Sequence, residues 1–352
     1  MAQFHSLKIK SILRQTEKAV SITFEVPELL KTAFDFKAGQ YISLKTLIDD
    51  QEIRRDYSLS SSPASGDLTI TVKEIEDGVF SSYANKHLKV GDALDVAAPN
   101  GRFFYDAHPE STTTVAAFAA GSGITPIMSI ARTLLETEAQ SQFILIYGNK
   151  SPKATIFHEE ILTLKTLYAD RFKVQFVYSE VDEDGALFGR IDSGIINYVL
   201  KNTIAVQDTQ KFYLCGPEGM INTVNGLLIE KGVEASQISF ELFTASTATE
   251  PTSSPSSKKG ESKITILVDE EETTLSMLQK HTILEVALAN DVDVPYSCQG
   301  GVCSSCICRV TEGSATMRQN NVLTDNEVAE GLVLSCQAEP TSATLKVDFD
   351  DI

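Results

Sequence analysis

The sequence predicts a multidomain protein: an antiparallel β-barrel, then a doubly wound parallel α/β domain, then a small C-terminal β-grasp domain. Near Thr112 the hydrophobic pattern changes from short β-rich runs to alternating strands and helices. A segment rich in Ser, Thr and Pro at 246–262 is typical of a flexible linker, and a group of closely spaced cysteines follows it. We therefore expect domains at residues 1–110, 111–245 and 263–352.

The first domain contains six short β-rich runs separated by Gly, Pro and Asp turns. Runs of this kind, without long helical segments between them, favour a small antiparallel barrel. The expected strands are residues 4–12, 20–25, 40–46, 55–59, 68–75 and 93–97.

The second domain alternates apolar strands with amphipathic helices, which is typical of a doubly wound parallel sheet. The expected strands are residues 114–119, 143–147, 174–178 and 212–214. The expected helices lie near residues 125–137, 155–168, 192–201 and 218–231.

The third domain begins with a predicted hairpin and continues through a short helix into the cysteine loop. Two later strands would close a compact β-grasp sheet. The expected elements are strands 263–268 and 272–276, helix 283–290, and strands near 308–311 and 344–348.

Three cysteines of the third domain, Cys298, Cys303 and Cys306, form a C-x4-C-x2-C run, and Cys336 follows later in the chain. This spacing is typical of a plant-type [2Fe–2S] site, in which four thiolates surround two irons. Three ligands would come from one tight loop and the fourth from a distant segment. Two glycines inside the run let the loop turn sharply and leave backbone N–H groups free to face the cluster.

A structural zinc site and a disulfide framework are the alternatives for these cysteines. Zinc sites with four cysteines usually contain two C-x2-C pairs, whereas the second half here is the single Cys336. Disulfides are typical of small secreted domains, but this chain has six cysteines in 352 residues and no secretory segment. Cys308 begins an expected strand, so we interpret it as a packed thiol.

Acidic residues outnumber basic residues by 48 to 30, which gives a net charge of −18 at pH 7. Residues 263–352 hold 15 acidic and 5 basic residues, or −10 of that charge. This excess argues against nucleic acid as a partner. Two interpretations stay open: the acidic end only keeps the protein in solution, or it docks on a basic patch of another protein.

No run approaches the ~18 apolar residues that a membrane span needs. The N-terminal sequence MAQFHSLKIK also lacks the apolar core of a signal peptide. We therefore expect no membrane span and a cytoplasmic location.

An R-x-Y-S motif, Arg55 to Ser58, lies at the edge of an expected barrel strand. Its guanidinium suits a phosphate, its phenol ring suits the face of a flavin, and its Ser hydroxyl could reach the flavin N5. Gly78 to Ser81 then opens a helix expected at 81–87, where unpaired N–H groups suit a pyrophosphate. An Arg and a Tyr paired on a barrel surface would explain one motif but not both.

Two turns of the second domain lie at the carboxyl ends of expected strands, where parallel sheets bind ligands. Gly121 to Pro126 is a glycine turn running into a helix, although it lacks the third glycine of G-x-G-x-x-G. Cys215 to Pro217 follows the fourth strand and places a thiol at the same edge. A buried, inert thiol is the alternative for Cys215.

Together these motifs resemble the ferredoxin–NADP reductase superfamily, and the resemblance covers nearly the whole chain. The order of domains is similar to that of the reductases of bacterial multicomponent oxygenases, above all those of phenylacetyl-CoA epoxidase systems. The resemblance rests on RRDYSLSSSP (54–63), GVFSSY (78–83), AGSGITPIMS (120–129), YGNK (147–150), CGPEGM (215–220), PYSCQGGVCSSC (295–306) and LTDNEVAEGLVLSCQAEP (323–340).

The resemblance implies FAD, with FMN as the alternative, in the barrel, NADH or NADPH in the second domain and a [2Fe–2S] cluster in the third. The residues implied at the flavin are Arg55, Tyr57 and Ser58, with Gly78, Val79, Phe80 and Ser81 at its pyrophosphate. Those implied at the nicotinamide dinucleotide are Gly121, Gly123, Thr125, Pro126, Ser179, Gly216 and Pro217. The implied cluster ligands are Cys298, Cys303, Cys306 and Cys336.

The resemblance also implies catalytic roles for four residues, which are Ser58, Cys215, Glu241 and Phe243. Cys215 would face the nicotinamide ring and Glu241 would assist beside the flavin. Phe243 would cover the flavin until the nicotinamide displaces it.

Members of the family that use NADPH commonly have an Arg after the Ser that ends the third strand. Here Ser179 is followed by Glu180 and by the acidic run 182–184. Carboxylates repel a 2′-phosphate and accept from ribose hydroxyls, which favours NADH or dual use. Lys150 and Arg190 could still supply positive charge.

We interpret the protein as an NAD(P)H-dependent flavin and iron–sulfur reductase that delivers single electrons to a metal-containing oxygenase. A flavin is needed because a hydride carries two electrons whereas the cluster accepts one. The alternatives are a reductase of a ring-hydroxylating dioxygenase or desaturase, and a non-catalytic redox transducer.

Overall fold

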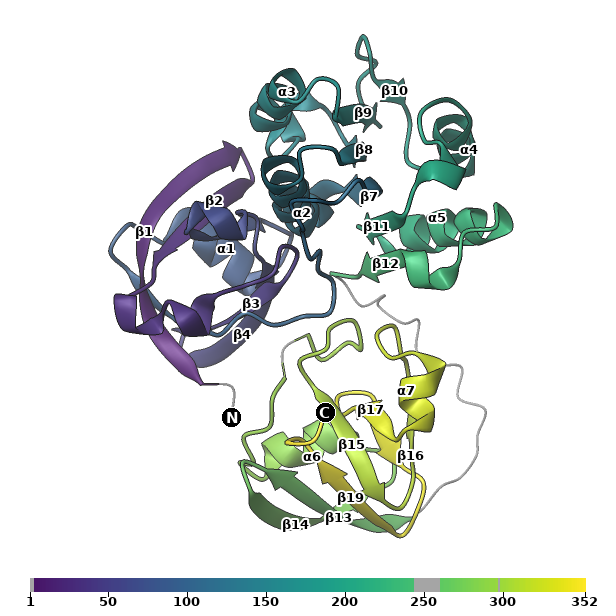
Figure 1. Cartoon of the computed structure of the whole chain (residues 1–352). Helices are drawn as coiled ribbons and strands as arrows, with labels where there is room; N and C mark the ends of the chain where they lie inside the picture. The colour runs from purple at the N-terminus through teal and green to yellow at the C-terminus, as the bar shows by residue number, and fades with distance from the viewer. Residues whose placement is uncertain (1–2, 244–259, 297) are drawn as a thin grey trace. The chain divides into compact units, whose positions relative to one another are not determined.

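The structure, a computed structural model, describes residues 3–243, 260–296 and 298–352. Residues Phe4–Glu241 form one compact unit, and the described residues from Leu242 onward belong to a second unit. Both units contain the sheets that the sequence predicts (Figure 1). Within the described ranges, no helix is long and apolar enough to cross a membrane.

The N-terminal sheet has six antiparallel strands in the order β4-β3-β6-β1-β2-β5. Its strands are β1 (Phe4–Thr16), β2 (Ala19–Glu25), β3 (Tyr41–Ile48), β4 (Gln51–Ser58), β5 (Leu68–Lys73) and β6 (Ala93–Ala97). Leu59, just after β4, forms a bridge to Ile70 of β5, and the Ser60 N–H donates to the Thr69 carbonyl at 2.8 Å. These contacts join the two edges of the curled sheet, so the predicted barrel is confirmed.

Side chains of the barrel strands alternate between the core and solvent. In β1, Leu7 and Ile9 are buried while Lys8 and Lys10 are exposed, as a period of two requires. Helix α1 (Val79–Lys86) begins two residues before the predicted start, because Phe80 already packs into the barrel core.

The second sheet is parallel throughout, in the order β10-β9-β8-β7-β11-β12. Its strands are β7 (Thr114–Ala120), β8 (Gln142–Asn149), β9 (Phe172–Tyr178), β10 (Leu187–Phe188), β11 (Lys211–Cys215) and β12 (Ile238–Glu241). The chain winds outward from β7 on one side and resumes at β11 on the other. A crevice for ligands is therefore expected between the carboxyl ends of β7 and β11.

Helices cover both faces of this sheet, with α2 and α3 on one face and α4 and α5 on the other (Figure 1). Their bounds are α2 (Ile124–Thr137), α3 (His158–Leu167), α4 (Ser193–Asn202) and α5 (Glu218–Glu230). The prediction placed the start of α3 at residue 155, which is wrong by three residues. Pro152–Ala154 forms a separate 3₁₀ turn, and Phe157 takes a positive φ of 61° before the helix begins.

The C-terminal unit contains a five-stranded sheet in the order β14-β13-β19-β15-β17 and a small β16–β18 pair. Its elements are β13 (Glu261–Val268), β14 (Glu271–Leu278), α6 (Ile283–Ala289), β15 (Ile307–Glu312), β16 (Ala315–Met317), α7 (Asp325–Ala329), β17 (Leu332–Leu334), β18 (Ala338–Pro340) and β19 (Thr344–Asp348). Helix α6 packs its buried side chains into the same core as this mixed sheet, which matches the predicted β-grasp arrangement.

The predicted linker 246–262 lies outside the described residues from 246 to 259. Its last two residues, Glu261 and Ser262, belong to β13, so this strand begins before the predicted residue 263. Ser262 is buried and its hydroxyl donates to the Ser342 carbonyl at 2.6 Å, which holds the start of the strand.

Candidate functional site

The last residues of β4 combine a half-buried aromatic ring with a buried hydroxyl. Tyr57 is half-buried, its ring centroid lies 5.4 Å from that of Phe80, and burial raises its pKa. Ser58 is buried at the end of the strand. Arg55 is exposed, and its Nη1 donates to the neighbouring Arg54 carbonyl at 2.6 Å. The guanidinium can therefore swing toward a phosphate without breaking an ion pair that the structure records.

The turn before α1 is tightly closed. The Ser81 hydroxyl accepts from the Ile75 N–H at 3.2 Å and donates to the Gly78 carbonyl at 3.2 Å. A Cβ at Gly78 would collide with the Ser81 hydroxyl. The Phe80 side chain lies in the barrel core, whereas Val79 is exposed. Within the described structure, no side chain caps the N-terminus of α1, so its first backbone N–H groups stay available. In the predicted pyrophosphate site these N–H groups, rather than the side chains, would bind the ligand.

The turn after β7 has a backbone that only glycines fit. Gly121 has a φ of 56°, and a Cβ at Gly123 would collide with the Cys215 carbonyl. The Thr125 hydroxyl donates to the Ser122 carbonyl at 3.1 Å, and both Thr125 and Pro126 are buried in α2. The turn therefore lies directly against the end of β11, at the crevice that the strand order predicts.

The end of β11 continues into the exposed Pro217 at the N-terminus of α5. A Cβ at Gly216 would lie 2.8 Å from the Met220 Cε and 3.2 Å from the Ala120 backbone N. The predicted residues of this turn are thus brought beside the glycine turn after β7.

Ser58, Cys215 and Glu241 come together where the barrel meets the parallel sheet. Ser58 Oγ donates to Glu241 Oε2 at 3.2 Å, and Glu241 pairs with Cys215 in the register of β12 and β11. Burial, with a smaller contribution from the charge of Asp56, raises the pKa of Glu241 to about 8, although the Ser58 hydrogen bond opposes the shift. Burial and the neighbouring Glu241 also raise the pKa of the fully buried Cys215 thiol.

The two remaining predicted residues are Ser179, on the parallel sheet, and Phe243, in the second unit. Ser179 follows β9, and its N–H donates to the Asn149 carbonyl at 3.0 Å, so it belongs to the outer part of the same sheet edge. Phe243 is 38% exposed and belongs to the unit that starts at Leu242.

The four cysteines of the predicted cluster gather in the C-terminal unit. The antiparallel register of Ile307 with Leu334 aligns the end of the cysteine loop with the segment before Cys336. As a result, the Cys306 and Cys336 sulfurs lie 3.3 Å apart. Cys298 lies on the half-exposed part of the loop.

Hydrogen bonds from Cys303 and Cys336, and from the backbone N–H groups of Gly300 and Val302, lower the pKa of Cys298. This environment favours a thiolate, the form that ligates iron, at Cys298, whereas hydrogen bonds to Cys298 and Cys306 raise the pKa of Cys336. Within the described ranges, no three His, Cys, Asp or Glu side chains are placed around a single metal ion. A [2Fe–2S] cluster instead distributes four sulfurs over two irons, and the gathered donor set fits it. Cys308 is fully buried and packed in the core, as predicted.

Three family models match consecutive parts of the chain. The "Oxidoreductase FAD-binding domain" matches residues 7–105 and the "Oxidoreductase NAD-binding domain" matches 118–226. The "2Fe-2S iron-sulfur cluster binding domain" matches residues 263–341. Together they follow the order of the barrel, the parallel sheet and the cysteine-bearing unit.

Curated relatives match over nearly the full length. One of the subunits of 1,2-phenylacetyl-CoA epoxidase from Escherichia coli K12 is 36% identical over 99% of both chains. The chain belongs to the ferredoxin–NADP reductase superfamily, in the branch that carries a C-terminal [2Fe–2S] domain. The ferredoxin reductase component of 3-ketosteroid-9-alpha-monooxygenase from Rhodococcus rhodochrous is 31% identical to this reductase, over 97% of this chain and 96% of the relative.

A solved structure supports the same assignment for the reductase. Phthalate dioxygenase reductase, described as modular for electron transfer from pyridine nucleotides to [2Fe–2S], matches 98% of both chains at 25% identity with a TM-score of 0.60. The reductase is thus an NAD(P)H-dependent oxidoreductase with FAD and [2Fe–2S] domains, as predicted.

Sequence reasoning missed Lys73 in this reductase. Lys73 ends β5, is half-buried, and has no hydrogen-bond acceptor or ion-pair partner among the described residues. A Cβ at Gly121 would lie 3.3 Å from its Nζ, so the ammonium lies beside the glycine turn. Burial, then repulsion from Lys150 and Lys18, lowers its pKa. A basic residue at the end of a barrel strand carries no motif, so only the packed structure could find it.

Two buried polar groups near Ser179 also lack partners in the described structure. They are the Asn149 amide nitrogen and the Tyr178 hydroxyl, at the carboxyl ends of β8 and β9. Orphaned polar atoms are uncommon in folded interiors, and each one in a native structure calls for an explanation such as a missing ligand or water. Beside them Lys150 Nζ forms an ion pair with Glu180 Oε1 at 2.9 Å.

Proposed function

We propose that this reductase supplies electrons from NADH to an oxygenase of the phenylacetyl-CoA epoxidase class. The choice of acceptor is supported by the 36% identity with a subunit of that system over 99% of both chains. The match includes the cysteine-bearing unit, which would deliver the electrons. The relative from a ketosteroid monooxygenase system is matched at 31%. We place the protein in the cytoplasm, where NADH is formed.

In this proposal the flavin is held by main-chain and aromatic groups. The half-buried Tyr57 ring would cover one face of the flavin, and the uncapped N-terminus of α1 would receive its pyrophosphate. When bound, FAD takes a hydride from the nicotinamide and passes single electrons to the [2Fe–2S] cluster. The Ser58 hydroxyl, held by Glu241, would lie at the reacting edge.

The nicotinamide dinucleotide would lie across the crevice between β7 and β11. Backbone N–H groups of Gly121 to Gly123 would face its phosphates, with the unpaired Lys73 ammonium beside them. Cys215 and Glu241, which are partners in the register of β11 and β12, would border the nicotinamide ring. An ionised Glu241 would stabilise the positive charge that develops on the ring as the hydride leaves.

The ion pair of Lys150 and Glu180 supports NADH as the coenzyme. Lys150 directly follows β8, and its charge at this edge of the sheet is neutralised by the Glu180 carboxylate. The Glu180 N–H also donates to the Lys150 carbonyl at 3.0 Å, which keeps the two residues together. Glu180 can then accept from ribose hydroxyls, whereas a 2′-phosphate would meet a carboxylate.

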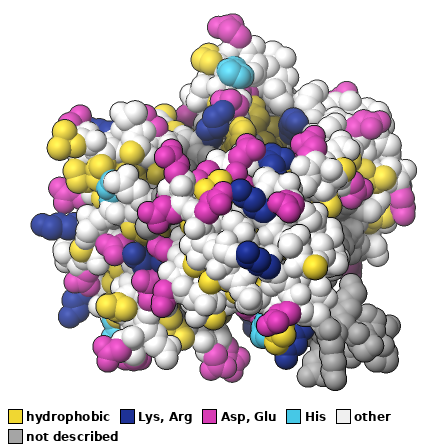
Figure 2. Space-filling model, turned by 90° about the horizontal axis from the view of Figure 1, so that it is seen from below, with side chains coloured by type: hydrophobic (Ala, Val, Ile, Leu, Met, Phe, Trp, Pro, Cys, Tyr) yellow, Lys and Arg dark blue, Asp and Glu magenta, His cyan; other side chains and the backbone are white. Residues whose placement is uncertain are grey.

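The cysteine loop would be the exit for electrons. Residues 298–306 contain no charged side chain, so another protein could approach the cluster closely. Asp291 and Asp293 precede this loop and Asp325 follows it, within a domain of net charge −10. On the face shown in Figure 2, acidic side chains are spread widely over the surface. We infer that the acceptor presents a basic docking patch.

The proposal is tested by reconstituting electron transfer to a purified phenylacetyl-CoA epoxidase, with a ring-hydroxylating dioxygenase as the comparison acceptor. We expect faster transfer to the epoxidase, and slower transfer as salt rises, because screening at 0.15 M shortens electrostatic attraction to about 8 Å. NADH-dependent reduction of ferricyanide, which needs no docking, should change much less.

Preference for the dioxygenase would refute the proposed acceptor. If electron transfer to the epoxidase and ferricyanide reduction depended equally on salt, the acidic surface would serve only solubility. The same assays with NADPH decide the coenzyme: a kcat/KM that favours NADPH more than about tenfold, or ~1.4 kcal/mol, would contradict the role of Glu180.

A further inference from the structure

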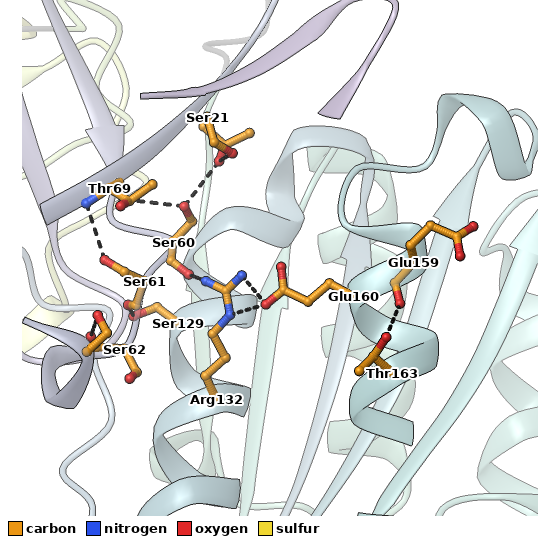
Figure 3. A network of polar contacts seen from close by, with 12 residues as sticks. Ser21, Ser60, Ser61, Ser62, Thr69, Ser129, Arg132, Glu159, Glu160 and Thr163 are labelled. Atoms are coloured by element: carbon orange, nitrogen blue, oxygen red, sulfur yellow. Dashed lines mark hydrogen bonds and ion pairs between the residues drawn. The ribbon is translucent and has the colours of Figure 1, made fainter. Parts of the chain in front are cut away.

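One face of α2 binds three consecutive residues of the barrel (Figure 3). The Ser129 hydroxyl donates to the Ser61 carbonyl at 2.6 Å, and Arg132 Nη1 donates to the Ser60 carbonyl. The Ser62 hydroxyl donates to Glu136 Oε2 at 2.6 Å. Residues at i, i+3 and i+7 lie along one stripe of a helix, so α2 fastens to the segment 60–62 over two turns.

Arg132 ties this stripe to a third segment. Its Nε donates to Glu160 Oε1 of α3 at 2.7 Å, and its guanidinium carbon lies 5.2 Å from the centre of the Phe157 ring. The side chain is 15% exposed. The Arg132 guanidinium therefore binds the Ser60 carbonyl of the barrel while Glu160 and Phe157 fix its orientation. Contacts to both segments make this a rigid connection.

The two ends of this connection adjoin the two binding sites. Ser60 follows Ser58 by two residues, on the segment that leaves the flavin strand β4. Helix α2 begins directly after the glycine turn Gly121–Gly123. A shift at Arg132 would thus move the dinucleotide turn relative to Tyr57 and Ser58.

We propose that Arg132 is a positioning residue for hydride transfer, because it sets the spacing between the flavin strand and the dinucleotide helix. The inference rests on the reductase activity described above. In that step a C–H bond at the dihydronicotinamide C4 breaks and an N–H bond at the flavin N5 forms. The nicotinamide is oxidised by two electrons and the flavin is reduced by two. Displacing reacting groups by about 1 Å can cost ~10²-fold in rate.

Arg171 offers a matched control within the same domain. Its Nη1 and Nη2 donate to the Glu138 and Leu135 carbonyls at 2.7 and 2.9 Å, and its guanidinium lies 5.0 Å from the Tyr168 ring. Like Arg132, it joins backbone carbonyls and an aromatic ring. Unlike Arg132, it contacts no barrel residue that the structure records, so its loss should affect stability without moving the two sites apart.

The test compares full-length R132Q, R132K and R171Q proteins with the wild type by stopped-flow reduction with NADH and 4-deuterated NADH. For R132Q we expect the limiting rate of flavin reduction to fall about tenfold or more. The long-wavelength charge-transfer absorbance of the NADH complex should weaken, and the deuterium isotope effect should change. R132K, which keeps one donor, should recover part of each signal, whereas R171Q should stay within about twofold of the wild type.

Melting temperatures separate positioning from folding. If R132Q and R171Q lose similar stability and neither changes the charge-transfer band or the isotope effect, Arg132 is only structural and the inference is overturned. Should R132Q fail to fold, S129A provides the same readouts through the neighbouring contact to Ser61. Wild-type protein that NADH does not reduce would overturn the reductase function itself, whereas normal wild-type reduction with an unchanged R132Q overturns only the positioning role.

Discussion

At the scale of single residues, Glu241 shows how packing changes the chemistry of a side chain. Its carboxyl group would ordinarily titrate at 4.5, but burial raises the pKa to about 8 against the opposing effect of the Ser58 hydrogen bond. A carboxyl group whose pKa is raised in the folded state binds a proton more tightly there than in the unfolded chain. Stability therefore falls as pH rises from about 4.5 toward 8, because ionisation is easier after unfolding.

This environment predicts a pH dependence of flavin reduction. Above about pH 8 the ionised Glu241 should stabilise the cationic nicotinamide product, so the limiting rate with NADH should rise through an inflection near that pH. E241Q should remove the inflection and also flatten the fall in melting temperature between about pH 5 and pH 8. Stopped-flow rates and thermal unfolding across this range provide the measurements.

The Ser58 hydroxyl supplies the control, because its hydrogen bond lowers the pKa of Glu241. S58A should therefore move the inflection to higher pH without removing it. An inflection that persists unchanged in E241Q would assign it to another group.

At the scale of elements, the β13–β14 hairpin carries backbone strain at its turn. Its two turn residues, Asp269 and Glu270, both have positive φ, 52° and 63°, as a two-residue type I′ turn requires. The Asp350 carboxylate accepts from both of their N–H groups, at 2.8 and 2.9 Å, which holds the turn. Glycine adopts this backbone without the penalty that a Cβ brings.

We therefore expect E270G to stabilise the cysteine-bearing unit by about 0.5–1 kcal/mol. The backbone N–H that donates to Asp350 is kept, so the contact should survive. Loss of cluster absorbance on heating reports the stability of this unit. E271G, one residue later in the exposed start of β14, is the matched control and should destabilise it; equal effects of the two changes would show that the turn is not strained.

At the scale of the whole molecule, two-electron and one-electron chemistry are assigned to separate units. The proposed hydride site lies within Phe4–Glu241, where the barrel and the parallel sheet each have a buried core. The cysteines lie in the second unit, which has a core of its own. We therefore expect each unit to fold on its own.

A fragment of residues 1–245 should therefore fold, bind FAD and reduce ferricyanide with NADH. It should lose electron transfer to cytochrome c, because that transfer passes through the cluster. Flavin absorbance and the two reductase assays measure these outcomes. Separately produced residues 260–352, which keep the whole of β13, are added back as the control and should restore little transfer at low concentration. An unfolded 1–245 fragment would show that the predicted boundary is misplaced.

The sequence by itself determined the class of each domain and the order of the cofactor domains, and it predicted the cysteine ligands, because these depend on periodicity and short-range spacing. The C-x4-C-x2-C run and the R-x-Y-S motif are local features that the chain carries without its fold. The short strands β10, β12, β16, β17 and β18 were not predicted, since two to four residues show too little periodicity.

Only the tertiary structure decided how distant residues act on one another. It brought Lys73 to the glycine turn after β7, Glu241 to the Ser58 hydroxyl, and Arg132 to the Ser60 carbonyl. It also turned the Ser81 hydroxyl back onto its own loop, where it accepts from the Ile75 N–H and donates to the Gly78 carbonyl. These relations depend on the packing of the barrel against α2 and on strand register, which join parts of the chain that are far apart in sequence.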